Sequence, residues 1–234
     1  MGLVTLALPW LFVATWPVLL LAAAFTCFLI ALRYSPALRR LLGGVIDGVA
    51  RDSMGEICFP VAAGLVFLLS AGDPLLFCIP MLVLALADAA AALVGARYGT
   101  LLYATADGHK SVEGSLAFLV VAFLCSHITL LLFTDTGAAE CLAIALAMAL
   151  LVMLLEAIAW GGLDNLFIPL GAFFLLKAFL QLELIALEFS VALAIVLTVC
   201  SLLLCRPRSV TGRGNSADQA GSAHDLRPLA GGIR

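Results

Sequence analysis

The sequence contains few charged residues. Asp, Glu, Lys and Arg make up 12% of its 234 residues, which is about half of the share in a typical soluble domain. Hydrophobic residues make up 64%, and a soluble core of this size could not bury so much apolar surface. The composition therefore excludes a soluble enzyme, a disordered chain and a secreted disulfide scaffold, and it predicts an all-α polytopic membrane protein. The apolar runs are long and uninterrupted, unlike the short alternating strands of an outer-membrane barrel.

The sequence also lacks several signals that would indicate other classes of protein. It has no basic run, so we expect no nucleic-acid partner. Its seven cysteines form no CxxC pair and lie within or at the edge of apolar runs, which is typical of small hydrophobic residues inside helices. The N-terminus lacks the positively charged segment and the cleavage site of a signal peptide, so we interpret it as part of the first membrane span.

Seven apolar runs predict a transmembrane helical bundle of about seven spans. The first run contains Pro9 and Pro17, and it could form one kinked span or a re-entrant segment followed by a span. Residues 206–234 are rich in Arg, Gly, Ser and Pro, so we expect a disordered tail after a membrane domain of residues 1–205. The predicted spans cover residues 4–32, 56–72, 75–96, 113–133, 138–160, 166–182 and 185–205.

The positive residues predict how the spans are oriented. With seven spans, every Lys and Arg except Lys177 falls in the loops and the tail on one side of the membrane. Cytoplasmic loops carry an excess of positive charge. We therefore expect the N-terminus outside and the C-terminus in the cytoplasm.

Polar residues near the predicted cytoplasmic face are the candidates for function. Charged side chains within or against a bilayer are costly, and they usually mark a functional site. Here carboxylates meet Lys and Arg side chains, the combination that a metal-bound polyphosphate requires. These polar residues are Asp88 in the third predicted span, Glu113 at the start of the fourth, Glu156 near the inner end of the fifth, and Asp164 and Asn165 at the start of the sixth.

Small residues and one aspartate share a face of the third span. Asp88, Ala91, Gly95 and Gly99 recur at steps of three and four residues, which places them on the same side of a helix. Such a stripe lets a neighbouring helix or a ligand approach the backbone closely. Helix packing alone would explain the glycines, but it does not require the carboxylate of Asp88 at that depth.

The loop before the fourth span carries a cation followed by residues that start a helix. Lys110 can reach a phosphate group as a point charge. Ser111 is a candidate N-cap, and Glu113 then lies in the first turn, where it interacts favourably with the helix dipole. Capping is therefore one explanation of these two residues. The N-terminus of this helix, with Gly114 and Ser115, could also offer backbone N–H groups to an anion.

A glycine pair separates the fifth and sixth spans. Gly161 and Gly162 predict a helix break, and Asp164 or Asn165 could cap the helix that follows. Capping needs one polar residue rather than two, so both are candidates for the site. Glu156 could belong to the same site or extend to the membrane interface.

Three segments together resemble a known family of membrane enzymes. The pattern Asp88-x-x-Ala91-x-x-x-Gly95-x-x-x-Gly99, followed by Lys110-Ser111-x-Glu113-Gly114-Ser115, resembles the CTP-binding region of the dolichol kinase, phytol kinase and CTP-dependent diacylglycerol kinase family. Glu156 with Gly162-x-Asp164-Asn165-x-x-x-Pro169 is similar to the second signature of that family. Arg51-x-x-x-Gly55-Glu56 is similar to a segment that often precedes both. The segments cover residues 51–169 in the family's order.

The resemblance implies an integral-membrane kinase that transfers the γ-phosphoryl group of CTP to a polyprenol, a phytol-like alcohol or diacylglycerol. It implies Mg²⁺ held by Asp88 and Asp164, and a general base at Glu113 or Glu156. Bacterial relatives imply a bacterial inner membrane as the location, with the active site on the cytoplasmic face. The residues implied for nucleotide binding are Ala91, Gly95, Arg97, Gly99, Lys110, Ser111, Gly114 and Asn165, with Lys110 and Arg97 neutralising phosphate oxygens.

Two other functions remain open on the sequence alone. A phosphatidate cytidylyltransferase could bind CTP with the same residues, but the attack would occur at the α-phosphorus and release pyrophosphate. A transporter or a non-catalytic membrane protein would place polar residues along a route across the bilayer. The candidate residues gather at one face, and only Lys177 is a buried outlier in this prediction, which favours an enzyme.

Overall fold

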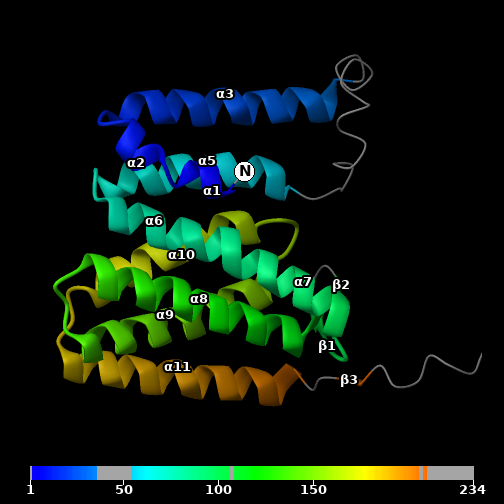
Figure 1. The fold of residues 1–234 in the computed structure, drawn as a ribbon. Helices are drawn as coiled ribbons and strands as arrows, with labels where there is room; N and C mark the ends of the chain where they lie inside the picture. The colour runs from blue at the N-terminus through cyan, green and yellow to red at the C-terminus, as the bar shows by residue number, and fades with distance from the viewer. Residues whose placement is uncertain (1, 36–53, 106–107, 206–207, 210–234) are drawn as a thin grey trace, which may run out of the picture.

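The computed structural model describes residues 2–35, 54–105, 108–205 and 208–209. In this part of the chain, antiparallel helices lie side by side as a bundle (Figure 1). The all-α membrane fold predicted from the composition is confirmed for the described residues, with one small sheet added to it. Arg51 and almost all of the predicted tail lie outside the described residues.

The first predicted span consists of two short helices followed by a long one. α1 (Gly2–Thr5) and α2 (Leu8–Leu11) precede α3 (Thr15–Tyr34). Of the two predicted alternatives, the structure therefore shows a separate segment followed by a span, and not one kinked span. Pro9 lies at the start of α2 and Pro17 in the first turn of α3, where the missing N–H is tolerated. α1 lies against the middle of the third span, since a Cβ atom added to Gly2 would be 2.8 Å from the Ala85 Cβ.

The later helices begin and end close to the predicted bounds. In the described residues, five helices are long and apolar enough to cross a membrane: α3, the continuous α6–η1–α7, α8, α9 and α11. α5 and α10 have 16 residues each, whereas a span needs about 20. A multi-pass membrane protein is therefore confirmed, and the count of seven spans stays a prediction. The elements are α5 (Gly55–Ser70), α6 (Pro74–Leu82), the π-helical η1 (Val83–Asp88), α7 (Ala89–Tyr98), α8 (Val112–Phe133), α9 (Ala138–Ile158), α10 (Asp164–Phe179) and α11 (Leu184–Cys205).

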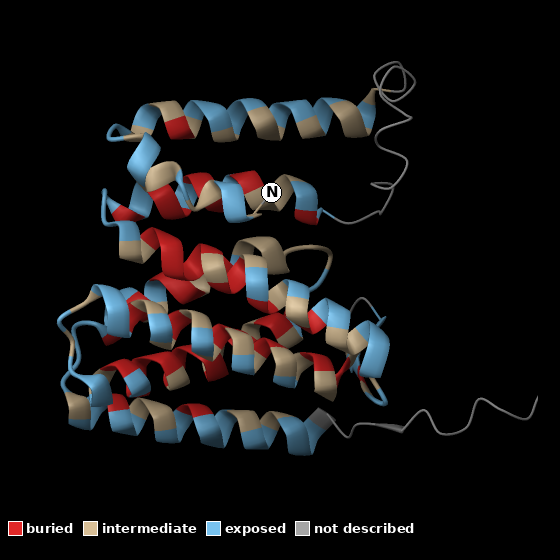
Figure 2. Cartoon of the chain, viewed as in Figure 1, coloured by how far each residue is buried: buried red, intermediate tan, exposed pale blue. Residues whose placement is uncertain are grey.

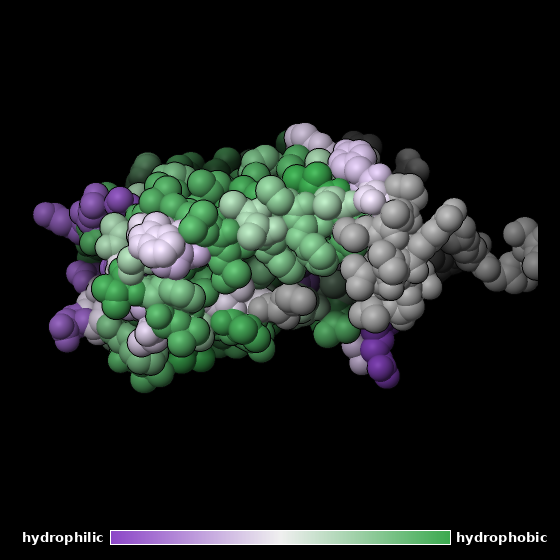
Figure 3. Space-filling model, turned by 90° about the horizontal axis from the view of Figure 1, so that it is seen from above, coloured by the Kyte–Doolittle hydropathy of each residue, from purple (hydrophilic) through white to green (hydrophobic). Residues whose placement is uncertain are grey.

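Burial separates the inner helices from two peripheral ones (Figure 2). In α9, 61% of the most apolar stretch is buried, whereas the values for α3 and α11 are 6% and 11%. Phe77, Phe118 and Phe173 are among the large side chains that fill the interior. Apolar side chains also cover much of the outer surface (Figure 3), as expected for helices that face lipid.

The fold contains a small antiparallel sheet that the hydropathy pattern does not predict. β1 (Leu101–Thr105) and β2 (Gly108–Ser111) form a hairpin between α7 and α8, at one end of the bundle (Figure 1). β3 (Arg208–Ser209) pairs with the other edge of β1. Two residues of the predicted tail therefore have a defined place in the sheet, and the rest of that prediction falls on residues outside the described ranges.

The glycine pair between α9 and α10 forms the predicted break. Gly161 and Gly162 have φ angles of 66° and 84°, in the left-handed region that favours glycine. The chain reverses there, which brings the end of α9 next to the start of α10. The Met54 N–H donates a hydrogen bond to the Gly161 carbonyl oxygen at 2.9 Å, and this bond holds the start of α5 at the same end of the bundle.

Candidate active site

Four predicted site residues come together at the end of the bundle that carries the hairpin. Asp88 closes η1, Lys110 lies on β2, Glu156 lies in the last turn of α9, and Asp164 starts α10. The carboxylate of Asp88 interacts electrostatically with Asp164, Glu156 and Lys110. Residues far apart in the sequence therefore form one group, which we call the polar cluster.

Lys110 and Glu156 form an ion pair within the polar cluster. The Lys110 Nζ lies 2.7 Å from the Glu156 Oε1, and it also donates a hydrogen bond to the backbone carbonyl oxygen of Glu156. A cation in this place satisfies a carbonyl group at the helix C-terminus and interacts favourably with the helix dipole. The Glu156 side chain is only 7% exposed, so it points into the cluster and does not extend to the interface.

One carboxylate oxygen of this ion pair has no partner. Glu156 Oε2 is buried and has no hydrogen-bond partner within the described part of the chain. Leaving a buried polar atom unpaired costs free energy, on the order of 1–3 kcal/mol and more for a charged group. The arrangement leaves this oxygen available to accept a hydrogen bond or a proton from a ligand.

Asp88 and Asp164 supply the carboxylates predicted to hold a metal ion. Asp88 is partly buried, and Asp164 Oδ1 accepts a hydrogen bond from the Asn165 N–H at 2.9 Å. Among the described residues, no three His, Cys, Asp or Glu side chains group as a metal site. Mg²⁺ usually keeps several waters and takes only one or two protein carboxylates together with substrate phosphates. Two carboxylates are a donor set that Mg²⁺ can use, and the binding of a metal ion by Asp88 and Asp164 stays a prediction.

Ser111 and Glu113 have structural partners at the start of α8. Ser111 Oγ accepts a hydrogen bond from the Gly114 N–H at 3.1 Å, which confirms the predicted N-cap. Glu113 Oε1 accepts hydrogen bonds from the backbone N–H groups of Thr100 and Leu101 at 3.0 and 3.1 Å, and another from the Thr100 hydroxyl. Glu113 therefore holds the connection between α7 and β1.

The predicted glycines lie between α7 and α8. A Cβ atom added to Gly114 would be 2.9 Å from the Ala91 carbonyl oxygen and 3.3 Å from the Gly95 Cα. A Cβ atom on Gly99 would be 2.8 Å from the Ser111 Cβ. The explanation by helix packing is thus the one observed for these glycines, and their contact with a nucleotide stays a prediction.

Arg97 and Lys177 are two further cations of the sequence, and each lies near an aromatic ring. Arg97 is exposed at the end of α7, with its guanidinium carbon 5.7 Å from the centroid of the Tyr98 ring. Its contact with phosphate stays a prediction. Lys177 is exposed in the last turn of α10, 5.8 Å from the centroid of the Phe173 ring. The expectation that Lys177 is a buried outlier is therefore wrong, because a long side chain near a helix end can carry its charge to the interface.

Tyr103 is not among the predicted site residues, and the hairpin brings it next to the site. Tyr103 pairs with Lys110 in the register of β1 and β2, and it is buried, with 8% of its surface exposed. A signal for the hairpin exists in the sequence, since Asp107-Gly108 follows a short run that contains Leu, Tyr and Thr. An Asp-Gly pair after such a run indicates a hairpin, although Gly108 itself lies on β2, opposite Thr105.

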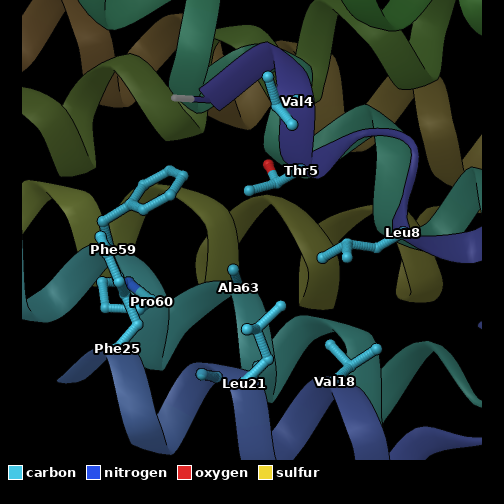
Figure 4. Close-up of a pocket in the computed structure, with 11 residues that line it drawn as sticks. Val4, Thr5, Leu8, Val18, Leu21, Phe25, Phe59, Pro60 and Ala63 are labelled. Atoms are coloured by element: carbon cyan, nitrogen blue, oxygen red, sulfur yellow. The ribbon is translucent and has the colours of Figure 1, made fainter. Parts of the chain in front are cut away.

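An apolar pocket of about 410 Å³ lies between α3, α5 and the two N-terminal helices (Figure 4). Phe59 and Ala63 of α5 contribute to its lining. Cys58 points to another side of α5, where Asp164 acts electrostatically on its thiol, because successive residues on a helix are about 100° apart. The pocket and the polar cluster therefore lie on different sides of α5.

Comparisons with known proteins identify the family. No family model matches the chain, and no solved structure matches it. The phytol kinase of Synechocystis sp. (strain ATCC 27184 / PCC 6803 / Kazusa) is 33% identical to the chain over 174 residues, which cover 73% of the chain and 72% of that protein. Identity at this level over most of both chains indicates common ancestry, and the chain belongs to the family of polyprenol and phytol kinases.

Proposed function

We propose that this protein is a CTP-dependent kinase of a lipid alcohol and that the polar cluster is its active site. The supporting observation is the meeting of Asp88, Lys110, Glu156 and Asp164 at one end of a membrane bundle, in a member of a kinase family. Phosphoryl transfer uses carboxylates that hold Mg²⁺, a cation for the phosphate groups and an acceptor for the proton of the attacking hydroxyl. The cluster contains one candidate for each part.

In the proposed reaction, the hydroxyl oxygen of the alcohol attacks the γ-phosphorus of CTP. The bond between that phosphorus and the bridging oxygen breaks, CDP leaves, and the proton of the hydroxyl passes to Glu156 Oε2. Lys110 turns from Glu156 to the phosphate oxygens when the nucleotide binds. Glu156 then loses its counter-ion and becomes a better proton acceptor.

The other predicted residues support this site. Mg²⁺ bound by Asp88 and Asp164 would neutralise charge on the β- and γ-phosphates. Asn165 follows Asp164 directly and is proposed to support the same side of the site, and Arg97 is proposed to contact phosphate from the exposed end of α7. Gly95 and Gly114 have no side chain, so they allow α7 to lie close to α8.

We propose a phytol-like alcohol as the acceptor, with polyprenol and diacylglycerol as alternatives, because the similar Synechocystis protein is a phytol kinase. The hydrocarbon chain would lie among the apolar helices while the hydroxyl reaches the polar cluster. We retain the predicted orientation, which places the cluster at the cytoplasmic face, where a nucleotide is available. The proposed location is the inner membrane of a bacterium.

A labelling assay tests the proposed function. The purified protein in lipid nanodiscs is given CTP labelled at either the γ- or the α-phosphate, together with phytol, a polyprenol, diacylglycerol or phosphatidate. We expect γ label in the lipid product, with Mg²⁺ present, and no transfer by D88N or K110M. K177M is the matched control for K110M, since it removes a cation far from the cluster, and it should retain activity.

Two results would contradict the proposal. Transfer of the α label to phosphatidate would identify a cytidylyltransferase. Absence of transfer to every alcohol by folded wild-type protein, with ATP tested as an alternative donor, would indicate a non-catalytic protein.

A further inference from the structure

Tyr103 lies beside Lys110 on the hairpin. The two residues are directly opposite each other in the antiparallel pair of β1 and β2. Residues in this relation project from the same face of the sheet, with Cβ atoms about 5 Å apart. That face is turned toward the bundle, because Tyr103 is buried and the Lys110 ammonium group reaches Glu156 on α9.

The Tyr103 hydroxyl connects the hairpin to α8. Its oxygen lies 2.7 Å from the Ser115 Oγ, in a hydrogen bond in which either group can donate. Ser115 belongs to the first turns of α8. The same turns also provide Glu113, which holds the start of β1 through Thr100 and Leu101. The hairpin is thus fastened to α8 at its beginning and at its middle.

In the segment from Lys110 to Ser115, most residues hold the hairpin, α7 and α8 together, and one residue reaches the polar cluster. Ser111 caps α8, Glu113 and Ser115 hold β1, and Gly114 allows α7 to approach. Lys110 alone of these residues contacts Glu156 in the polar cluster. A lysine side chain is long and flexible, so the direction in which it reaches depends on how firmly its strand is held.

We infer that Tyr103 is a positioning residue, which acts through its hydrogen bond to Ser115 to hold the hairpin so that Lys110 is directed at Glu156 and at the phosphate groups of the nucleotide. The phosphate part of this inference rests on the proposed function. The direction of Lys110 does not depend on it. The bond joins the strand that carries the cross-strand partner of Lys110 to a helix of the bundle. Without it, β1 and β2 can rock away from α8 and move Lys110 with them.

The first experiment measures the direction of Lys110 without using activity. The sequence contains only two lysines, Lys110 and Lys177, so Lys177 serves as an internal reference for an amine-acylating reagent, with mass spectrometry as the readout. In wild-type protein the ion pair should slow acylation of Lys110. Y103F and S115A should raise its rate relative to Lys177 by several-fold, whereas S115T should restore the wild-type rate. S126A is the matched control, because the Ser126 hydroxyl donates its hydrogen bond to the Ala122 carbonyl oxygen within α8.

The second experiment measures kinetics. Removing one hydrogen bond is worth about 0.5–1.5 kcal/mol, so Y103F and S115A should each raise the KM for CTP by about three- to tenfold while leaving kcat and the KM for the alcohol unchanged. The double variant should be no worse than either single variant, because both remove the same bond. S115T should recover the wild-type KM.

The outcomes separate the inference from the proposed function. An unchanged acylation rate of Lys110 in Y103F would overturn the inference. Additive effects of Y103F and S115A on the KM for CTP would also overturn it, since independent effects exclude a shared bond. An inactive wild-type protein whose Lys110 still becomes more reactive in Y103F and S115A would contradict the proposed function and leave the positioning by Tyr103 supported.

Discussion

Two glutamates are candidates for the general base, and they differ in what surrounds each carboxylate. Glu113 lies in the first turn of α8 and is only partly buried, and its carboxylate accepts hydrogen bonds from the backbone N–H groups of Thr100 and Leu101. Glu156 is buried, and its Oε2 has no partner in the described part of the chain. A general base needs a free oxygen within reach of the reacting hydroxyl. These surroundings favour Glu156.

Substitution by glutamine separates the two glutamates. E156Q should lower kcat by about 10²- to 10⁴-fold, the usual contribution of a general base. E113Q should keep kcat close to wild type, because the glutamine carbonyl oxygen can still accept hydrogen bonds from Thr100 and Leu101. Initial rates at saturating CTP and alcohol measure both effects. Equal losses in the two variants would show that burial does not distinguish the base.

Removal of one aspartate should change the dependence on Mg²⁺. A chelator should abolish transfer by the wild-type protein, and added Mg²⁺ should restore it. D164N should raise the Mg²⁺ concentration for half-maximal activity by about tenfold or more, since it removes one of two proposed carboxylate ligands. The measurement is a Mg²⁺ titration of the rate, with K177M as the control. A lower kcat at an unchanged Mg²⁺ requirement would exclude Asp164 as a ligand.

The contact between α7 and α8 depends on glycine. G114A would place a Cβ atom 2.9 Å from the Ala91 carbonyl oxygen, and such overpacking costs about 1–3 kcal/mol. We expect a lower Tm in detergent for G114A. G137A is the matched control, because its Cβ atom would meet only Glu140, at 3.6 Å, and should leave the Tm unchanged. A Tm of G114A equal to that of G137A would show that the two helices can separate without cost.

The sequence predicts the long elements well and the short ones poorly. The helices from α8 to α11 begin and end within a few residues of the predictions, because membrane spans need long apolar runs and these end at polar or glycine-rich turns. The pattern of long apolar runs does not reveal the hairpin, because β1 (Leu101–Thr105) is short and directly follows a span. The π-helical turn at Val83–Asp88 is also invisible in the sequence, because it changes the winding of the helix but not its hydropathy.

The sequence predicts that the site residues gather at one end of the bundle, but it does not predict which of them are in contact. The positive-charge pattern places the loops around Lys110 and Asp164 at one face, and the two residues do lie in the same cluster. Helix spacing and charge cannot predict that Lys110 pairs with Glu156, because this contact depends on the hairpin. Nor do they predict that Glu113 faces Thr100 and not the cluster.

Reporter fusions test the orientation of the bundle. A reporter that is active only outside the cytoplasm should work after Asp135, in the turn between α8 and α9, and should fail after Gly108 in the hairpin. Green fluorescent protein should give the reverse pattern, because the two positions lie at opposite ends of α8. The opposite result at both positions would invert the predicted orientation and place the polar cluster on the outer face.

The π-helical turn before α7 lets the third span accommodate a change in length without turning Asp88 away from the polar cluster. Each residue added to or removed from a helix turns everything beyond it by about 100°, and the wide turn of η1 takes up residues at the cost of a locally altered winding. A deletion of one codon between positions 83 and 87 would still leave a membrane-crossing helix of nearly the same length. Because the turn can then return to α-helical winding, Asp88 keeps nearly the same orientation relative to α6, so this deletion should be tolerated better than the same deletion elsewhere in the span.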